Sequence, residues 1–114
     1  PPWPGTGAGM FVAFDPFVVN LADPGGSRFL RLTLKLVVDT PEHAKELVED
    51  EIVRARIRSA MLELLALQTA DQLVTPEGKA ALKKELVEHA GHEAHEADET
   101  KVTDVLFSEF VVQF

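Results

Sequence analysis

The sequence lacks cysteine, any long apolar run and any glycine-rich phosphate-binding motif. Without cysteine there is no disulfide and no thiolate chemistry. Because no run reaches about 18 apolar residues, the chain as given does not span a membrane, and no signal peptide is visible. Gly25-Gly26 is expected to form a turn, since the spacings typical of phosphate and dinucleotide loops are absent.

Positive charge is scarce: 11 Lys and Arg residues stand against 19 Asp and Glu residues, for a formal net charge of −8. This argues against nucleic acid as a partner and against tight binding to an anionic membrane surface. Catalytic patterns are missing too, because Ser27, Ser59 and Ser108 belong to no nucleophile motif. The consecutive carboxylates 49–51 are expected on a solvated helix surface. We therefore expect no enzyme and no cofactor.

The length of 114 residues fits one compact domain. Residues 1–9 contain three Pro and three Gly, which predicts a linker before a single domain at 10–114. Trp3 is expected either to stay solvated or weakly docked, or to anchor at a membrane interface beside a transmembrane helix absent from this sequence. The first residue is Pro rather than Met, so we expect an excised piece of a longer protein.

Alternating apolar residues predict a β-hairpin at the start of the domain. Residues 10–21 form the first strand candidate, and Pro16 marks it as an edge strand or a bulge. Turn residues 23–27 lead into a second strand at 28–39. Its even positions are apolar and its odd positions largely polar, which predicts one core face and one wet face.

Residues 102–114 predict the last strand, because they are rich in Val and Phe and contain no Gly or Pro. Both parities carry apolar residues, for example Leu106 and Phe110 on one and Val105 and Phe107 on the other. A period of two therefore predicts a strand deep in the sheet and covered by a helix. Truncation before Val105 is expected to unfold the domain.

Two helices are predicted between these strands. Thr40-Pro41-Glu42 opens a helix that runs to about residue 67, and Thr75-Pro76-Glu77 opens a second that runs to about residue 90. Residues 69–72 resemble a capping box that starts a short turn. The expected fold class is α+β, with a twisted, mainly antiparallel sheet of about three strands packed against two helices.

Residues 89–101 are acidic, rich in His and without an apolar period, so a mobile loop is expected there. His89, His92 and His95 form the one cluster that resembles a site, since imidazole binds Zn, Cu or Ni. Gly91 weakens a helix, and nothing apparent fixes the rings in place. We expect no functional metal site, and a metal- or ligand-responsive module using these three histidines is the alternative function.

Four ordered blocks carry a family likeness: residues 14–23 (FDPFVVNLAD), 28–32 (RFLRL), 64–79 (LLALQTADQLVTPEGK) and 105–113 (VLFSEFVVQ). They resemble the periplasmic domain of the FliL family of flagellar basal-body-associated proteins. The likeness extends from about residue 11 to residue 114, and residues 89–101 depart from the family's shorter connection.

The resemblance implies a short cytoplasmic N-terminus and one inner-membrane helix, both outside this sequence, followed by a periplasmic domain with a fold similar to stomatin-type SPFH domains. It implies a non-enzymatic basal-body component that forms homo-oligomeric rings around stator units of MotA and MotB, and so influences torque, swimming and swarming. Membrane contact would come only through the absent helix. The stomatin likeness also leaves open an organiser of lipid microdomains, although a fold does not fix a function.

Ring assembly requires two complementary patches on each subunit. We predict subunit contacts from the helix surface around Arg54 and Arg58, from the strand edge near Pro16, or from the turn that begins at Asp23 and is followed by Arg28. A solvated, ion-paired helix surface is the alternative interpretation of the arginines.

Overall fold

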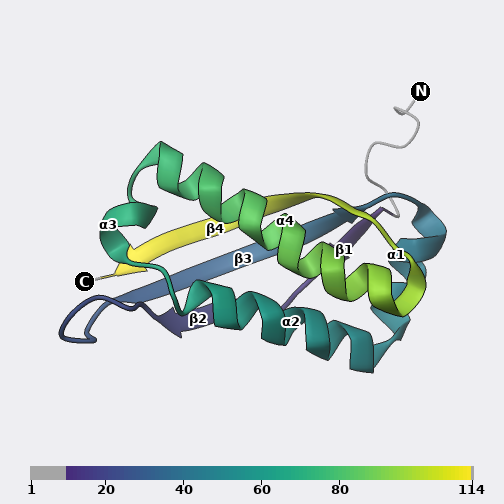
Figure 1. The fold of residues 1–114 in the computed structure, drawn as a ribbon, viewed down its shortest axis with the longest axis horizontal. Coiled ribbons are helices and arrows are strands. Elements are labelled where there is room, and N and C mark those ends of the chain that lie inside the picture. Colours follow the sequence, from purple (N-terminus) through teal and green to yellow (C-terminus); the bar gives the residue numbers. More distant parts are fainter. Residues whose placement is uncertain (1–9, 114) are drawn as a thin grey trace.

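The computed structural model describes residues 10–113, which form two layers: an antiparallel sheet and a set of helices packed on one of its faces (Figure 1). The α+β class is thereby confirmed. In chain order the elements are β1 (Phe11–Ala13), β2 (Phe17–Asn20), β3 (Phe29–Val38), α1 (Pro41–Glu49), α2 (Glu51–Leu65), α3 (Ala70–Leu73), α4 (Pro76–Asp98) and β4 (Val102–Gln113).

The central strand β3 pairs with all the other strands of the sheet. On one side it pairs with β2 at its beginning and with β1 at its end, and on the other side it pairs with β4. The expected first strand is thus two short strands in line, because Pro16 supplies no N–H and residues 15 and 16 pair with no residue of β3. Gly25 and Gly26 have φ of 97° and 65° in the turn before β3, which confirms that turn.

β4 lies at the edge of the sheet, so the expectation of a strand deep in the sheet was wrong. A register shift opposite Thr33 and Leu34 leaves Ser108 as an extra residue, and such a bulge reverses which parity faces the helices. The residues of β4 that pair with the buried leucines of β3 are therefore Val105 and Phe107 before the bulge and Phe110 and Val112 after it. Apolar residues at both odd and even positions of β4 thus lie on the face of the sheet that packs against the helices.

Asp50 divides the predicted helix 41–67 into α1 and α2. Its Oδ1 accepts a hydrogen bond from the Val53 backbone N–H at 3.1 Å, so Asp50 is both the C-cap of α1 and the N-cap of α2. The predicted N-cap roles of Thr40 and Thr75 are confirmed: their hydroxyls accept from His43 N at 3.0 Å and Gly78 N at 2.9 Å. Two predicted helices thus become three longer ones and the single turn α3.

α4 continues to Asp98, so the mobile loop expected at 89–101 was wrong. Ala90 and Ala94 are fully buried and extend at four-residue spacing the stripe begun by Leu82 and Leu86. Glu99, with φ of 59°, ends the helix in the left-handed region.

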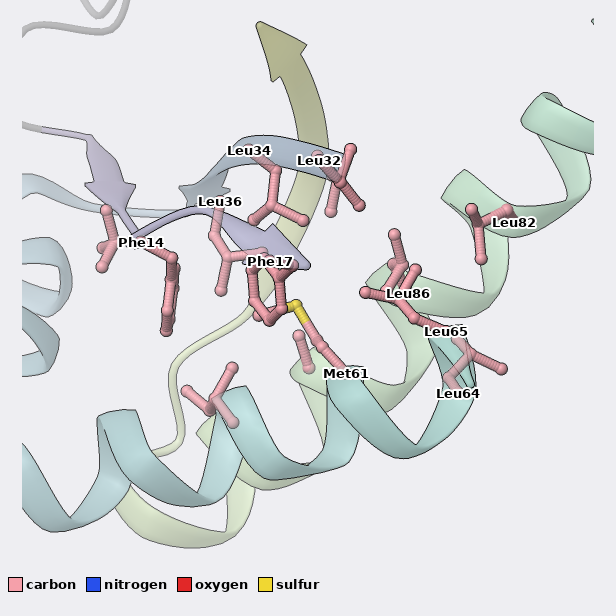
Figure 2. Close-up of a cluster of buried hydrophobic side chains, with 14 of the residues drawn as sticks. Phe14, Phe17, Leu32, Leu34, Leu36, Met61, Leu64, Leu65, Leu82 and Leu86 are labelled. Carbon is pink, nitrogen blue, oxygen red and sulfur yellow. The ribbon is translucent and has the colours of Figure 1, made fainter. Parts of the chain in front are cut away.

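The core lies between the helices and the leucine face of β3. Figure 2 shows Leu32, Leu34 and Leu36 from the sheet facing side chains from α2 and α4, with Met61 reaching toward Phe17. The odd-numbered face of β3, with Arg31 and Lys35 exposed, confirms the predicted wet face. Within the described residues no helix is both long and apolar enough to cross a membrane.

Candidate interaction surfaces

The three predicted cluster histidines lie on the exposed side of α4. His89 Nδ1 is 2.8 Å from the Glu85 carbonyl oxygen, and His92 Nε2 is 3.0 Å from Glu96 Oε1. Within residues 10–113 no group of three or more His, Cys, Asp or Glu is placed to hold a metal ion. The two ring contacts run along one helix, so they do not make a preformed cage that would favour the metal-responsive alternative.

The structure brings together three of the residues predicted from sequence to form contacts: Arg54, Arg58 and Pro16. Arg54 Nη2 donates to the Ala13 carbonyl at 2.9 Å, and Arg58 donates to the carbonyls of Asp15 at 2.8 Å and Pro16 at 2.9 Å. These carbonyls belong to the last residue of β1 and to the break that separates β1 from β2. The two arginines therefore satisfy backbone acceptors that the sheet leaves unpaired, and we call this arrangement the arginine clamp.

Aromatic rings complete the arginine clamp. The guanidinium carbon of Arg54 lies 5.3 Å from the centroid of the Phe14 ring, and that of Arg58 lies 4.1 Å from the centroid of Phe17. Both distances are within the range of a cation–π interaction. Phe14 and Phe17 are at most 6% exposed, so the clamp attaches α2 to core residues on both sides of the break.

An open hollow of about 320 Å³ lies beside the arginine clamp, between β1 and the junction of α1 and α2. Charges of both signs line it, so it offers no strong preference for an anion. Its lining consists of Phe14, Asp15, Val48, Glu51, Arg54, Ala55 and Arg58.

Asp23 and Arg28, the other two predicted contact residues, join the hairpin turn to α3. Arg28 Nη1 lies 3.3 Å from Asp23 Oδ2 and 3.8 Å from Asp71 Oδ1. Asp23 Oδ1 accepts a hydrogen bond from the Ala70 backbone N–H at 2.9 Å, which satisfies a donor at the start of α3. Because the Asp23 side chain is only 8% exposed, its main contacts are within the molecule.

One end of the molecule gathers carboxylates, which the sequence did not reveal. A hollow of about 580 Å³ is lined by Glu46, Glu49, Asp50, Glu51, Ile52 and Asp98. Beside it Val48 and Ile52 are 47% and 68% exposed. We call these carboxylates together with Val48 and Ile52 the acidic end. Sequence placed Asp98 in a loop; only the full length of α4 carries it to the junction of α1 and α2.

Lysines gather at the opposite end of α4. Lys79 Nζ lies 5.0 Å from the centroid of the Phe110 ring, Lys83 Nζ lies 3.6 Å from Asp104 Oδ1, and Lys84 is exposed at the next position. We call Lys79, Lys83 and Lys84 the lysine strip. Lys79 and Lys83 lie on the side of α4 that faces β4, and Lys84 is exposed next to them in sequence.

The junction of β3 and α1 holds a titratable pair. His43 Nδ1 is 2.8 Å from Asp39 Oδ1, and each side chain is 26% exposed. This hydrogen bond raises the pKa of His43, against a smaller opposing effect of burial. For Asp39, burial favours a higher pKa, but the hydrogen bond and charge of His43 together outweigh it and lower the pKa. The pair is therefore charged over a wider pH range than either group alone.

Comparisons with known proteins identify the family to which this chain belongs. The family model described as flagellar basal body-associated protein FliL matches residues 11–113. A protein named flagellar protein FliL from Aquifex aeolicus (strain VF5) is 34% identical over 104 residues, which cover 91% of this chain and 61% of that protein. This chain therefore belongs to the FliL family of flagellar basal-body-associated proteins, a non-enzymatic family of motility components.

Proposed function

We propose that this chain is the periplasmic part of an inner-membrane protein that forms rings around flagellar stator units and supports them. Its partners would be MotA and MotB, other basal-body components and further copies of itself. The observation that carries the proposal is the family match, which spans every strand and helix from β1 to β4. Membrane attachment would come from a helix preceding the present sequence.

The distribution of polar groups supports a scaffold that works through its surfaces. Within the described residues, Thr100 is the one polar side chain that is fully buried, and the hollows are open and lie on the outside. A catalytic centre needs polar groups positioned in a water-excluding pocket. A scaffold needs instead a rigid body with distinct patches, which the two-layer fold provides.

The five contact residues predicted from sequence remain part of this proposal. Arg54, Arg58 and Pro16 shape one surface on the β1–β2 side, and Asp23 and Arg28 shape another at the hairpin turn. Each is engaged within the molecule, so it would contribute to a subunit contact mainly by fixing the backbone around it. The first surface is tested by replacing both Arg54 and Arg58 with Glu and measuring ring assembly and motility.

That test requires a stability control, because the arginine clamp holds the β1–β2 break. A double variant that folds with the wild-type melting temperature, assembles rings and supports swimming would exclude this surface as a subunit contact. A double variant that unfolds would show only that the arginine clamp stabilises the fold, and would not test the subunit contact. In that case Arg54→Lys with Arg58→Lys keeps the charge while removing the forked geometry.

The stator partnership is tested by co-purification of the full-length protein with MotA and MotB, with and without residues 10–113. The proposal expects MotA and MotB in the eluate only when this domain is present. Recovery of equal amounts without the domain, in cells that swim and swarm normally, would refute it.

A further inference from the structure

We infer that copies of this chain associate head to tail, with the acidic end of one copy on the lysine strip of the next. The inference rests on the proposed ring-forming function and names the two surfaces that would build the ring. Neither surface belongs to the five contact residues predicted from sequence, whose main contacts lie within the molecule.

The acidic end has the composition of a docking surface for a basic partner. Its lining contains five carboxylates and no Lys or Arg. Within the described residues, Glu46, Glu49, Glu51 and Asp98 form no ion pair, and Asp98 Oδ2 is shut off from solvent without a hydrogen-bond donor. A buried carboxylate oxygen without a donor is costly. The exposed carboxylates Glu46, Glu49 and Glu51 are the groups that incoming ammonium groups can reach.

Apolar side chains beside the carboxylates make this more than a solvated acidic face. Val48 and Ile52 are among the most exposed large apolar residues of the chain, at 47% and 68%. Val48 is in α1 and Ile52 is in α2, so the two residues lie on either side of the Asp50 junction. Interfaces combine apolar and charged contacts; at this end Ile52 lines the acidic hollow, and Val48 lines two other hollows that share Glu51 or Glu49 with it.

The lysine strip offers the complementary surface on the same chain. Lys79, Lys83 and Lys84 lie on the first turns of α4, and Phe107 and Phe110 are half-buried on the strand beside them, with ring centroids 5.3 Å apart. The lysine strip is positively charged beside partly exposed aromatic rings, and the acidic end is negatively charged beside exposed aliphatic side chains. The two surfaces are therefore opposite in charge and similar in their mixture of charged and apolar groups. In contrast, two acidic ends would repel each other, as would two lysine strips.

The positions of the two surfaces allow each copy to use both at once. Figure 1 shows the start of α4 near α3 and its end near α1, so the lysine strip and the acidic end lie at opposite ends of a helix of 23 residues. A helix of that length is about 35 Å long. Contacts between two different surfaces are heterologous and generate rings when the rotation closes. Because each contact is charge-specific, the direction of assembly is also fixed.

A charge-exchange experiment tests the pairing. One variant carries Glu46→Lys, Glu49→Lys and Glu51→Lys; the other carries Lys79→Glu, Lys83→Glu and Lys84→Glu. The control exchanges charges elsewhere on the helix layer, with Arg56→Glu and Glu63→Lys at exposed positions of α2. Sedimentation of the 114-residue chain is measured up to about 1 mM, the effective concentration that a short membrane tether provides. Circular dichroism and melting confirm that each variant folds.

The wild-type chain and the control should self-associate, and each triple variant alone should do so roughly 100-fold more weakly. An equimolar mixture of the two triple variants should recover association, because every contact in an alternating assembly again joins opposite charges. Salt at about 1 M, which shortens the Debye length to about 3 Å, should weaken all of these complexes.

Three results would overturn the inference: a wild-type chain that stays monomeric at about 1 mM, triple variants that associate like wild type, or a mixture that does not recover. A monomeric chain that still binds a basic partner would assign the acidic end to that partner. None of these results bears on the co-purification of the full-length protein with the stator, so the two proposals fail independently.

Discussion

Replacing Arg58 by alanine tests whether the arginine clamp stabilises the fold. The substitution removes two hydrogen bonds, to the carbonyl oxygens of Asp15 at 2.8 Å and Pro16 at 2.9 Å, and a guanidinium 4.1 Å from the centroid of Phe17. Neither carbonyl has a partner within the sheet, because residues 15 and 16 lie between β1 and β2 and pair with no residue of β3.

The expected cost of Arg58→Ala follows from these contacts. Each hydrogen bond is partly open to water, so it contributes about 0.7 kcal/mol, in the lower half of the usual range. The cation–π contact adds about 0.7 kcal/mol at a partly exposed site. The free energy of unfolding should therefore fall by about 2 kcal/mol, which lowers the melting temperature by about 10 °C for a domain of this size. Arg58→Lys keeps the charge but loses the planar fork that reaches both carbonyls, so it should cost about half as much.

The assay is urea denaturation followed by circular dichroism, with amide hydrogen exchange in β2 as the local readout. Arg56→Ala is the matched control, since Arg56 is exposed on the same helix and its side chain makes no contact of this kind among the described residues. It should change stability by less than about 0.5 kcal/mol. Equal stability of Arg58→Ala and Arg56→Ala, with unchanged exchange in β2, would refute the clamp.

Three further predictions concern pH, α4 and β4. The hydrogen bond to Asp39 raises the pKa of His43 above 6.5, so the pair stabilises the fold fully below that pH and loses its contribution as pH rises through the folded-state pKa. The stability difference between wild type and His43→Ala, measured from about pH 5.5 to about pH 9, should therefore shrink with rising pH. A difference that stays constant over this range would contradict the prediction. Ala94→Lys should lower the unfolding free energy by several kcal/mol, about the cost of forcing a charge into a filled core. Ala97→Lys, at an exposed position, should change the unfolding free energy little. Equal melting temperatures of the two variants would show that this segment is a loop rather than part of α4. Truncation before Val105 should abolish the cooperative melt, since it removes most of the strand that pairs with the central strand β3; a truncated chain with a normal circular dichroism spectrum and a cooperative melt would show that β4 is dispensable.

Local signals explain why much of the fold could be predicted. Alternation in β3, the turn glycines and the Thr-Pro-Glu helix starts each act within a few residues, and the structure confirms all of them. The prediction failed where a local signal was ambiguous. Asp50 within a helical pattern reads equally as a solvated acid or as a cap, and only the packing of α1 and α2 on different parts of the sheet decides for the cap.

The errors at β4 and α4 have a different origin, because they depend on tertiary contacts. The bulge at Ser108 is set by pairing with β3, and no feature of β4 alone shows that both parities face the same way. Similarly, Ala90 and Ala94 are too small to register as an apolar stripe among Glu and His, yet both are fully buried once α4 packs on the rest of the fold. A four-residue spacing of alanines that continues a leucine stripe was the available signal.

The candidate surfaces show how charge on a helix should be interpreted. The arginines of α2 were conspicuous in the sequence, but backbone carbonyls and aromatic rings of the same molecule engage two of them. The carboxylates 49–51 were expected on a solvated helix surface, but the fold adds Glu46 and Asp98 to them, lines their hollow with no Lys or Arg, and exposes Ile52 there. A charged residue is a stronger indication of an interface when the folded chain itself makes fewer contacts with it. By that criterion the acidic end is a stronger candidate for assembly than the arginine clamp, and the clamp's contribution is to hold the sheet edge on which the domain is built.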